Sequence, residues 1–192
     1  MRNGLLLFSA IEEIVEQSKS GFSLTSQLLR SLHAILIRNL YTCAGHFRQV
    51  NVEITNNSWR PPDWRRVPDL VDEMCAYINL RSDDSPIHSA AYLLWRHNWI
   101  HPFHGGNGRT SRNAAWLVLS ARFGFCLPGQ HTIPQQIVEN RDVYYNALQA
   151  ADAAALHGTV DVSQMESMLS DMLRTQLLSV HQPLRPGRQD GE

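Results

Sequence analysis

Residues 99–112, which read WIHPFHGGNGRTSR, contain the most informative pattern in the chain. His101 stands directly before Pro102, and a proline disfavours helical geometry in the residue that precedes it. The helix predicted over residues 86–100 therefore ends here and presents His101 at a turn. Phe103 is the apolar residue of this turn, and we expect it to anchor the loop in the core.

Three glycines follow, Gly105, Gly106 and Gly108, and they allow a ligand to approach the backbone N–H groups closely. Asn107 is a candidate N-cap for a helix predicted over residues 109–123. A glycine-rich loop that leads into a helix N-terminus binds anions, because free N–H groups and the helix dipole both favour negative charge.

Arg109 and Arg112 are three residues apart and share one face of this helix. Cations at a helix N-terminus oppose the dipole, so two arginines there predict an anionic ligand between them and the amides. With His101 they predict a general base beside a phosphate-binding loop. That arrangement suits transfer of a group from a nucleotide to a hydroxyl.

This stretch resembles the signature of the Fic family, H-x-F-x-[D/E]-G-N-G-R-x-x-R, and eleven of its twelve positions fit. The resemblance extends to GHFR at residues 45–48, RPPDWRRVPDLVDEM at 60–74 and NRDVYYNALQAAD at 140–152, and it covers residues 28 to 155. It implies an all-α fold, a helical bundle with a β-hairpin flap beside the active-site loop.

Residues 50–55 alternate apolar and polar side chains, which is typical of a strand, and Asn56 and Asn57 offer a turn after it. An isolated hairpin is marginally stable, so we expect this one to lie on the helical body or to pair with a further strand. The resemblance implies a flap that binds the target protein by strand addition, through Val50, Val52 and Ile54.

The resemblance implies a nucleotidyltransferase of the protein adenylyltransferase kind. It would move AMP, or another nucleoside monophosphate, from ATP or another nucleoside triphosphate to a Ser, Thr or Tyr hydroxyl of a target protein. His101 would be the general base. The implied phosphate-binding residues are Gly106, Asn107, Gly108, Arg109 and Arg112, and those of the base pocket are Asn140 and Tyr144.

Gly105 stands where the family has an Asp or Glu that binds the metal ion, so the sequence predicts no protein metal ligand there. Mg²⁺ is usually held by one or two carboxylates together with phosphate oxygens and water. Three readings stay open: transfer with Mg²⁺ held by phosphates and water, transfer of a different phosphate-linked group, and a catalytically impaired module that binds a nucleotide or a partner protein.

The N-terminal segment FSAIEE partly resembles the family's inhibitory helix, [S/T]-x-x-x-E-[G/N]. Ser9 and Glu13 have the required spacing, but Ile14 stands where Gly or Asn is usual, and Glu12 fits only in the alternative register. We expect either a solvated helix face or an inhibitory contact of Glu12 or Glu13 with Arg112.

Two other sites are less well supported. His97 and His101 have the spacing of H-E-x-x-H, but the glutamate is absent, and Pro102 takes His104 off the helix, so the histidines do not predict a metal site. No P-loop pattern occurs either.

The whole chain has 192 residues and predicts one helical domain with further helices over 5–17, 23–40, 68–80, 141–154 and 162–178. We expect residues 1–22 to form an N-terminal helix, 23–180 the catalytic domain and 181–192 a disordered tail. The apolar face of the last helix predicts core packing or a homodimer contact, through Met165, Met168, Leu169 and Met172.

The composition excludes several classes of binding partner and location. A net charge of −1 argues against binding to nucleic acid through a basic surface. No apolar stretch reaches the length of about 18 residues that a membrane-spanning helix needs, so we expect no membrane contact. Three widely spaced cysteines suggest no disulfide framework, and we expect a cytoplasmic protein.

Overall fold

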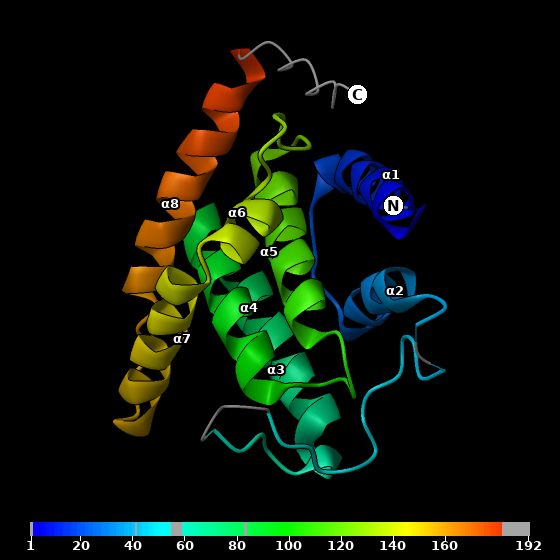
Figure 1. Ribbon diagram of the computed structural model, residues 1–192, viewed down its shortest axis with the longest axis vertical. Coiled ribbons are helices and arrows are strands. Elements are labelled where there is room, and N and C mark those ends of the chain that lie inside the picture. The colour runs from blue at the N-terminus through cyan, green and yellow to red at the C-terminus, as the bar shows by residue number, and fades with distance from the viewer. Residues whose placement is uncertain (1, 41, 55–58, 83, 182–192) are drawn as a thin grey trace, which may run out of the picture.

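The computed structural model describes residues 2–40, 42–54, 59–82 and 84–181. Within this part the chain forms eight α-helices and no strand, so the all-α prediction is confirmed (Figure 1). The helices are α1 (Arg2–Gln17), α2 (Ser26–Ile37), α3 (Val67–Leu80), α4 (Pro86–Ile100), α5 (Asn107–Phe123), α6 (Ile133–Glu139), α7 (Arg141–Leu156) and α8 (Ser163–Leu178).

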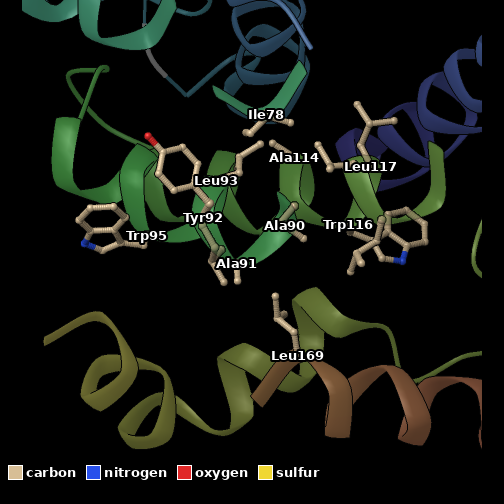
Figure 2. Close-up of a cluster of buried hydrophobic side chains, with 14 of the residues drawn as sticks. Ile78, Ala90, Ala91, Tyr92, Leu93, Trp95, Ala114, Trp116, Leu117 and Leu169 are labelled. Atoms are coloured by element: carbon tan, nitrogen blue, oxygen red, sulfur yellow. The ribbon is translucent and has the colours of Figure 1, made fainter. Parts of the chain in front are cut away.

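Helices α4 and α5 form the centre of the bundle, with α1 and α2 on one side and α7 and α8 on the other (Figure 1). Both central helices are buried on several faces, as expected of helices enclosed by others, although the first two turns of α5 are polar. Figure 2 shows Leu93 of α4 and Ala114 of α5 near Ile78 of α3. Buried alanines on both helices, Ala90 and Ala91 of α4 and Ala114 and Ala115 of α5, let the two backbones approach closely.

The methionine face of α8 belongs to this core. Met165 and Leu169 are fully buried, and Met168 and Met172 are 5% and 6% exposed. Leu169 points toward the helix that carries Ala90 (Figure 2). The core interpretation of this face is therefore confirmed, and these side chains are not free for a contact with a second copy.

The N-terminal segment joins the same body, because Leu7, Ile11 and Val15 of α1 are buried in the core. Helix α2 begins later than predicted: Thr25 is its N-cap, and its side chain accepts a hydrogen bond from the N–H of Leu28. The predicted tail falls almost wholly on residues 182–192, which lie outside the described residues.

Helix α6 is missing from the sequence prediction, and two glutamines hold it in place. Gln136 of α6 donates to the carbonyl of Met172 on α8 over 2.8 Å. Gln176 of α8 accepts from the N–H of Ile133 over 2.9 Å and donates to the carbonyl of Leu127. Such a short helix has little stability of its own; besides these distant contacts, Thr132 and Gln135 form a capping box at its start.

The flap predicted as a β-hairpin is irregular where it is described. We call residues 49–63 the flap loop; its tip, 55–58, lies outside the described residues, and no strand is assigned to the remainder. Asn51 and Glu53 are exposed while Val52 and Ile54 are half-buried, so the alternation of the sequence survives without a strand ladder. A two-stranded ribbon without a third strand is marginal, which accounts for the difference.

The two arms of the flap loop are nevertheless held by side chains. Arg60 and Glu53 form an ion pair of 2.7 Å, and Asn51 accepts a hydrogen bond from the N–H of Trp64 over 3.0 Å. Val50, the first residue of the predicted flap strand, is 53% exposed.

In the described part of the chain, none of the helices has the length and apolar character needed to cross a membrane.

Candidate active site

His101 follows the last residue of α4 and has a left-handed backbone conformation, with φ 52° and ψ 59°. Its N–H donates to the carbonyl of His97 over 2.9 Å, which closes the helix. The predicted turn is confirmed, although Pro102 favours extended geometry in the preceding residue. A left-handed residue with a side chain costs about 1–3 kcal/mol and persists only where its surroundings fix it.

Arg48 supplies part of that fixation. It is 3% exposed, its backbone N–H donates to the carbonyl of Pro102 over 2.9 Å, and its Nε donates to the carbonyl of His101 over 2.9 Å. In the sequence, Arg48 is only part of the stretch GHFR that resembles the family. No local pattern predicts its contact with His101, which is 53 residues away.

The loop of residues 103–106, which we call the motif loop, is closed by the side chain of Asn107. Its Oδ1 accepts from the N–H of Phe103 over 2.9 Å, and its Nδ2 donates to the carbonyl of Phe103 over 2.8 Å. Asn107 was predicted to be the N-cap, but the cap residue is Gly106. Asn107 therefore shapes the loop with its side chain and contributes its backbone to the helix start.

Gly106 is required for two reasons. Its φ is 77°, in the left-handed region that favours glycine. A Cβ atom at this position would also lie 2.4 Å from Cδ1 of Ile37 on α2. The motif loop thus packs directly against α2.

His33, to which the sequence assigned no role, binds the motif loop from α2. Its Nδ1 accepts from the N–H of Gly45 over 2.9 Å, so the proton is on Nε2, which lies 2.9 Å from the carbonyl oxygen of Gly105 and donates to it. The ring stacks on Phe103 with centroids 3.8 Å apart. Burial is the main cause that lowers the pKa of His33, and this keeps the ring neutral.

The start of α5 offers unpaired donors. The first N–H groups of a helix have no partner within it, and Gly106 has no side chain to accept from them. Among the described residues, none accepts a hydrogen bond from the N–H of Asn107, Gly108 or Arg109. These are three of the predicted phosphate-binding positions, and the structure brings them together at one helix end.

The guanidinium of Arg112 reaches back toward this helix end, because a Cβ atom at Gly108 would lie 3.2 Å from its Nη1. Arg112 is half-buried, and burial lowers its pKa, opposed by the hydroxyls of Tyr144 and Tyr145. Within the described residues, no carboxylate lies within ion-pair distance of it. A half-buried guanidinium beside open amides is suited to an anion. Arg109, in contrast, is exposed.

Burial lowers the pKa of His101 to about 4; the backbone of Asn98 opposes the shift and the charge of Arg48 adds to it. The Nδ1 atom of His101 is buried, and no atom of the described residues forms a well-aligned hydrogen bond with it. The imidazole is therefore neutral at pH 7, which is the state a general base requires.

The two residues predicted to line a base pocket lie in different surroundings. Asn140 is exposed between α6 and α7, and its side chain donates to the carbonyl of Gln136 over 2.8 Å. Tyr144 is 4% exposed, and its hydroxyl accepts from Asn98 over 2.9 Å. Burial raises the pKa of Tyr144 to about 12. The ring of Tyr144 thus supports α4 and does not present a face to a ligand here.

A cavity of about 300 Å³ opens beside Arg112. It is lined from α5 by Arg112 and Asn113, and from the α6 side by Pro134, Gln135, Val138 and Glu139. Asn140 follows directly after this lining in the chain. The side chain of Arg112 therefore borders both the open helix end and a concave space large enough for a small organic group.

Glu12 and Glu13 are exposed and do not pair with Arg112. Phe8 of the same helix contacts Trp116 of α5, and the charge of Glu12 acts on Cys126 after the end of α5. The helix rise puts about 16 Å between Arg112 and Phe123 along α5. The expected inhibitory contact is absent from the described structure, because α1 packs on the far half of α5.

The histidines do not form a metal site in the described residues, where no group of three or more potential ligands occurs. His97 is fully buried at 5.8 Å from Phe103, with neither ring nitrogen bonded, and burial lowers its pKa to about 3. His104 is exposed.

Several solved structures have the same fold. A Fic family protein from Desulfovibrio desulfuricans G20 matches with a TM-score of 0.69 at 22% identity, over 95% of this chain and 54% of that one. A Fic domain-containing signaling protein from Bacteroides thetaiotaomicron VPI-5482 matches with 0.69 at 22% identity, over 90% and 68%. A fragment of Fic-1 from C. elegans matches with 0.69 at 20% identity, over 92% and 49%.

The chain spans about half the length of the Desulfovibrio chain and of the C. elegans fragment. The family model for the Fic/DOC family matches residues 23–119, which include Arg48, His33 and the entire stretch from His101 to Arg112. This match extends over half of the 192 residues, and the chain belongs to the Fic/DOC family.

Proposed function

We propose that this protein is a nucleotidyltransferase that moves AMP, or another nucleoside monophosphate, from a nucleoside triphosphate to a Ser, Thr or Tyr hydroxyl of a target protein. The observation that carries the proposal is the half-buried guanidinium of Arg112 over Gly108, beside three unpaired amides at the start of α5. Such a group of donors without a carboxylate partner favours a polyanion.

His101 is the general base of this reaction. We assign the ring proton to Nδ1, which is buried, so that Nε2 accepts the proton of the target hydroxyl. The hydroxyl oxygen forms a bond to the α-phosphorus, the bond from that phosphorus to the bridging oxygen breaks, and diphosphate leaves. A pKa of about 4 keeps the base unprotonated over the physiological range.

The triphosphate would lie against the backbone of Gly106, Asn107 and Gly108, with the outer phosphates bound by Arg112 and Arg109. The nucleoside would occupy the cavity of about 300 Å³ beside Arg112, next to which Asn140 follows the lining residue Glu139 in the chain. Tyr144 would not contact the nucleoside but would support the site indirectly, because its hydroxyl binds Asn98 and so holds α4 in place.

The target segment would pair along the flap loop. Val52 and Ile54 are half-buried with exposed polar neighbours, so this arm is shaped to become a strand when another strand is added. Backbone pairing places a hydroxyl near His101 and demands little of the target's sequence.

The residues present do not fit a protein-held magnesium ion. Gly105 has no side chain, and its carbonyl oxygen is already bound by His33. We therefore assign no step to a metal and describe only what the side chains of this chain do.

Gly105 also favours a second candidate, a module that binds a nucleotide without transferring it, or that moves another phosphate-linked group. Replacement of the missing acid distinguishes these from the first proposal. If placement of Mg²⁺ limits the rate, Gly105→Asp raises transfer; an unchanged rate contradicts that explanation.

The test of the first proposal is incorporation of label into lysate protein from α-³²P-labelled ATP, GTP, CTP and UTP. We expect label with the wild type and none with His101→Ala, while His104→Ala, an exposed histidine three residues on, serves as the matched control. Binding without label favours the module, and label only from the γ position favours phosphate transfer.

A further inference from the structure

Arg48 connects two parts of the molecule that are distant in sequence. Its backbone N–H and its Nε bind the carbonyls of Pro102 and His101, and Nη2 lies 3.4 Å from the carbonyl of Ile100. One residue thus holds three successive carbonyls at the end of α4. Charge-assisted hydrogen bonds of this kind are stronger than neutral ones and give a defined geometry.

The other donors of the same guanidinium bind the flap loop. Nη1 donates to the carbonyl of Val50 over 3.0 Å, and Nη2 donates to the carbonyl of Pro62. These two residues lie on the two arms of the loop, before and after its tip. The planar group therefore joins both arms to the turn that carries His101.

A second link runs parallel to the first. The indole N–H of Trp59, on the return arm, donates to the carbonyl of Trp99 over 3.0 Å, and the two rings lie 4.9 Å apart. Trp99 precedes His101 by two residues. The flap loop is thus attached to the end of α4 at three points, at Val50 and Pro62 through Arg48 and directly at Trp59.

We propose that Arg48 is a positioning residue that couples the flap loop to the orientation of the His101 imidazole. The guanidinium of Arg48 donates to both arms and to the left-handed turn at His101. A movement of either arm therefore displaces the guanidinium and weakens its hydrogen bonds to the turn. The link to a target segment rests on the proposed function: seating a strand on the flap loop would fix the arms and hence align the base. The link between Arg48, the flap loop and His101 does not rest on it.

The titration of His101 reports this coupling. Burial is the main cause of its low pKa, the backbone of Asn98 on its own helix opposes the shift, and the charge of Arg48 on the flap side adds to it. A turn released from Arg48 lets water reach the ring, so the pKa rises from about 4 toward the ordinary 6.5.

The experiment is NMR titration of ¹³C-histidine-labelled, ligand-free protein, together with exchange of the Trp64 amide, whose N–H donates to the side chain of Asn51 on the other arm. Arg48→Lys keeps the positive charge, but one ammonium cannot reach both arms and the turn. Arg48→Gln removes the charge as well. Arg122→Lys is the matched control, because Arg122 also donates to a buried helix carbonyl, that of Ile78, far from the site.

We expect both Arg48 variants to raise the pKa of His101 by about one unit or more and to speed exchange of the Trp64 amide, which Asn51 binds, about tenfold. The control should change neither. A folded Arg48→Lys protein in which His101 titrates as in the wild type overturns the proposal. So does a shift seen with Arg48→Gln and not with Arg48→Lys, since charge alone would then account for it.

Should both Arg48 variants fail to fold, Trp59→Phe decides, because it removes the indole donor and keeps an aromatic ring. A rise in the pKa of His101 supports the coupling, and an unchanged value contradicts it. All these measurements are made without nucleotide or target. A failed transfer assay therefore leaves the coupling standing, and a failed titration leaves the transferase proposal standing.

Discussion

The Nε2 atom of His33 lies 2.9 Å from the carbonyl oxygen of Gly105, and this hydrogen bond fastens the motif loop to α2. The same ring accepts from Gly45 and stacks on Phe103. A single buried side chain thus fixes the loop at the position where the family has its acidic residue. His33 therefore holds the backbone of this loop in place although Gly105 lacks the carboxylate that the family has at this position.

His33→Phe should keep the stacked ring and lose both hydrogen bonds. Two buried backbone groups, the N–H of Gly45 and the carbonyl of Gly105, would remain unpaired, at a cost of about 1–3 kcal/mol each. Urea unfolding measures the loss, and ATP affinity should fall with it. The exposed His104→Ala control should change stability by less than about 0.5 kcal/mol; an equal effect of both variants would contradict this role.

Gly106→Ala should destabilise the protein more than Gly124→Ala does. Both glycines have a left-handed backbone, with φ 77° and 78°, so each substitution pays about 1–2 kcal/mol of backbone strain. Only at Gly106 would the new Cβ meet Ile37, at 2.4 Å, whereas nothing lies within 4 Å at Gly124. The extra cost of overpacking is about 1–3 kcal/mol. Equal melting temperatures for the two variants would rule out the contact with α2.

His97 should make the protein sensitive to acid. Its pKa is about 3 in the folded state and 6.5 in the unfolded chain, so the unfolded state takes up the proton first as the pH falls. Stability is complete above pH 6.5 and decreases below it, by about 1.4 kcal/mol per pH unit for this residue, until the pH reaches about 3.

His97→Leu should remove that part of the acid sensitivity. Because neither ring nitrogen is bonded in the described structure, it should also raise stability at pH 7 by about 1 kcal/mol. Urea unfolding between pH 5 and 7 compares the two slopes. His101 and His33 retain their lowered pKa values in the variant, so some slope persists. Identical slopes for the two proteins would show that His97 binds its proton normally.

Glu12→Gln and Glu13→Gln, alone or together, should leave ATP affinity unchanged within about twofold. Both side chains are exposed, and Glu12 acts on Cys126 beyond the end of α5, not on Arg112. Titration calorimetry measures the affinity. An ATP affinity about fivefold higher in the double variant would contradict this prediction. It would show that Glu12 or Glu13 makes an inhibitory contact with Arg112 in a second conformation.

Much of the fold could be predicted from local signals. Ser85 and Pro86 start α4 where the sequence predicts, and Gly124 ends α5 in the left-handed conformation expected of it. The end of α4 before His101 follows from Pro102. These features depend on neighbouring residues, which the sequence shows directly.

The supports of the site could not be predicted in this way. His33 reaches Gly105 across 72 residues, and Arg48 reaches His101 across 53. A histidine within the apolar stripe of α2 and an arginine in a loop carry no local sign of those partners. The predicted strand at residues 50–55 shows the opposite case, because its pattern is present but no strand among the described residues pairs with it.

Binding of ATP measured by titration calorimetry, with Arg112→Ala beside Arg174→Ala, tests the central claim most directly. Arg112 is half-buried over Gly108, while Arg174 is an exposed arginine on α8 whose side chain is 77% accessible. We predict that the wild type and Arg174→Ala bind equally and that Arg112→Ala binds about tenfold or more weakly, the loss of one charge-assisted contact. Equal affinity of all three proteins, or no binding to the wild type, would contradict the nucleotide site at the start of α5.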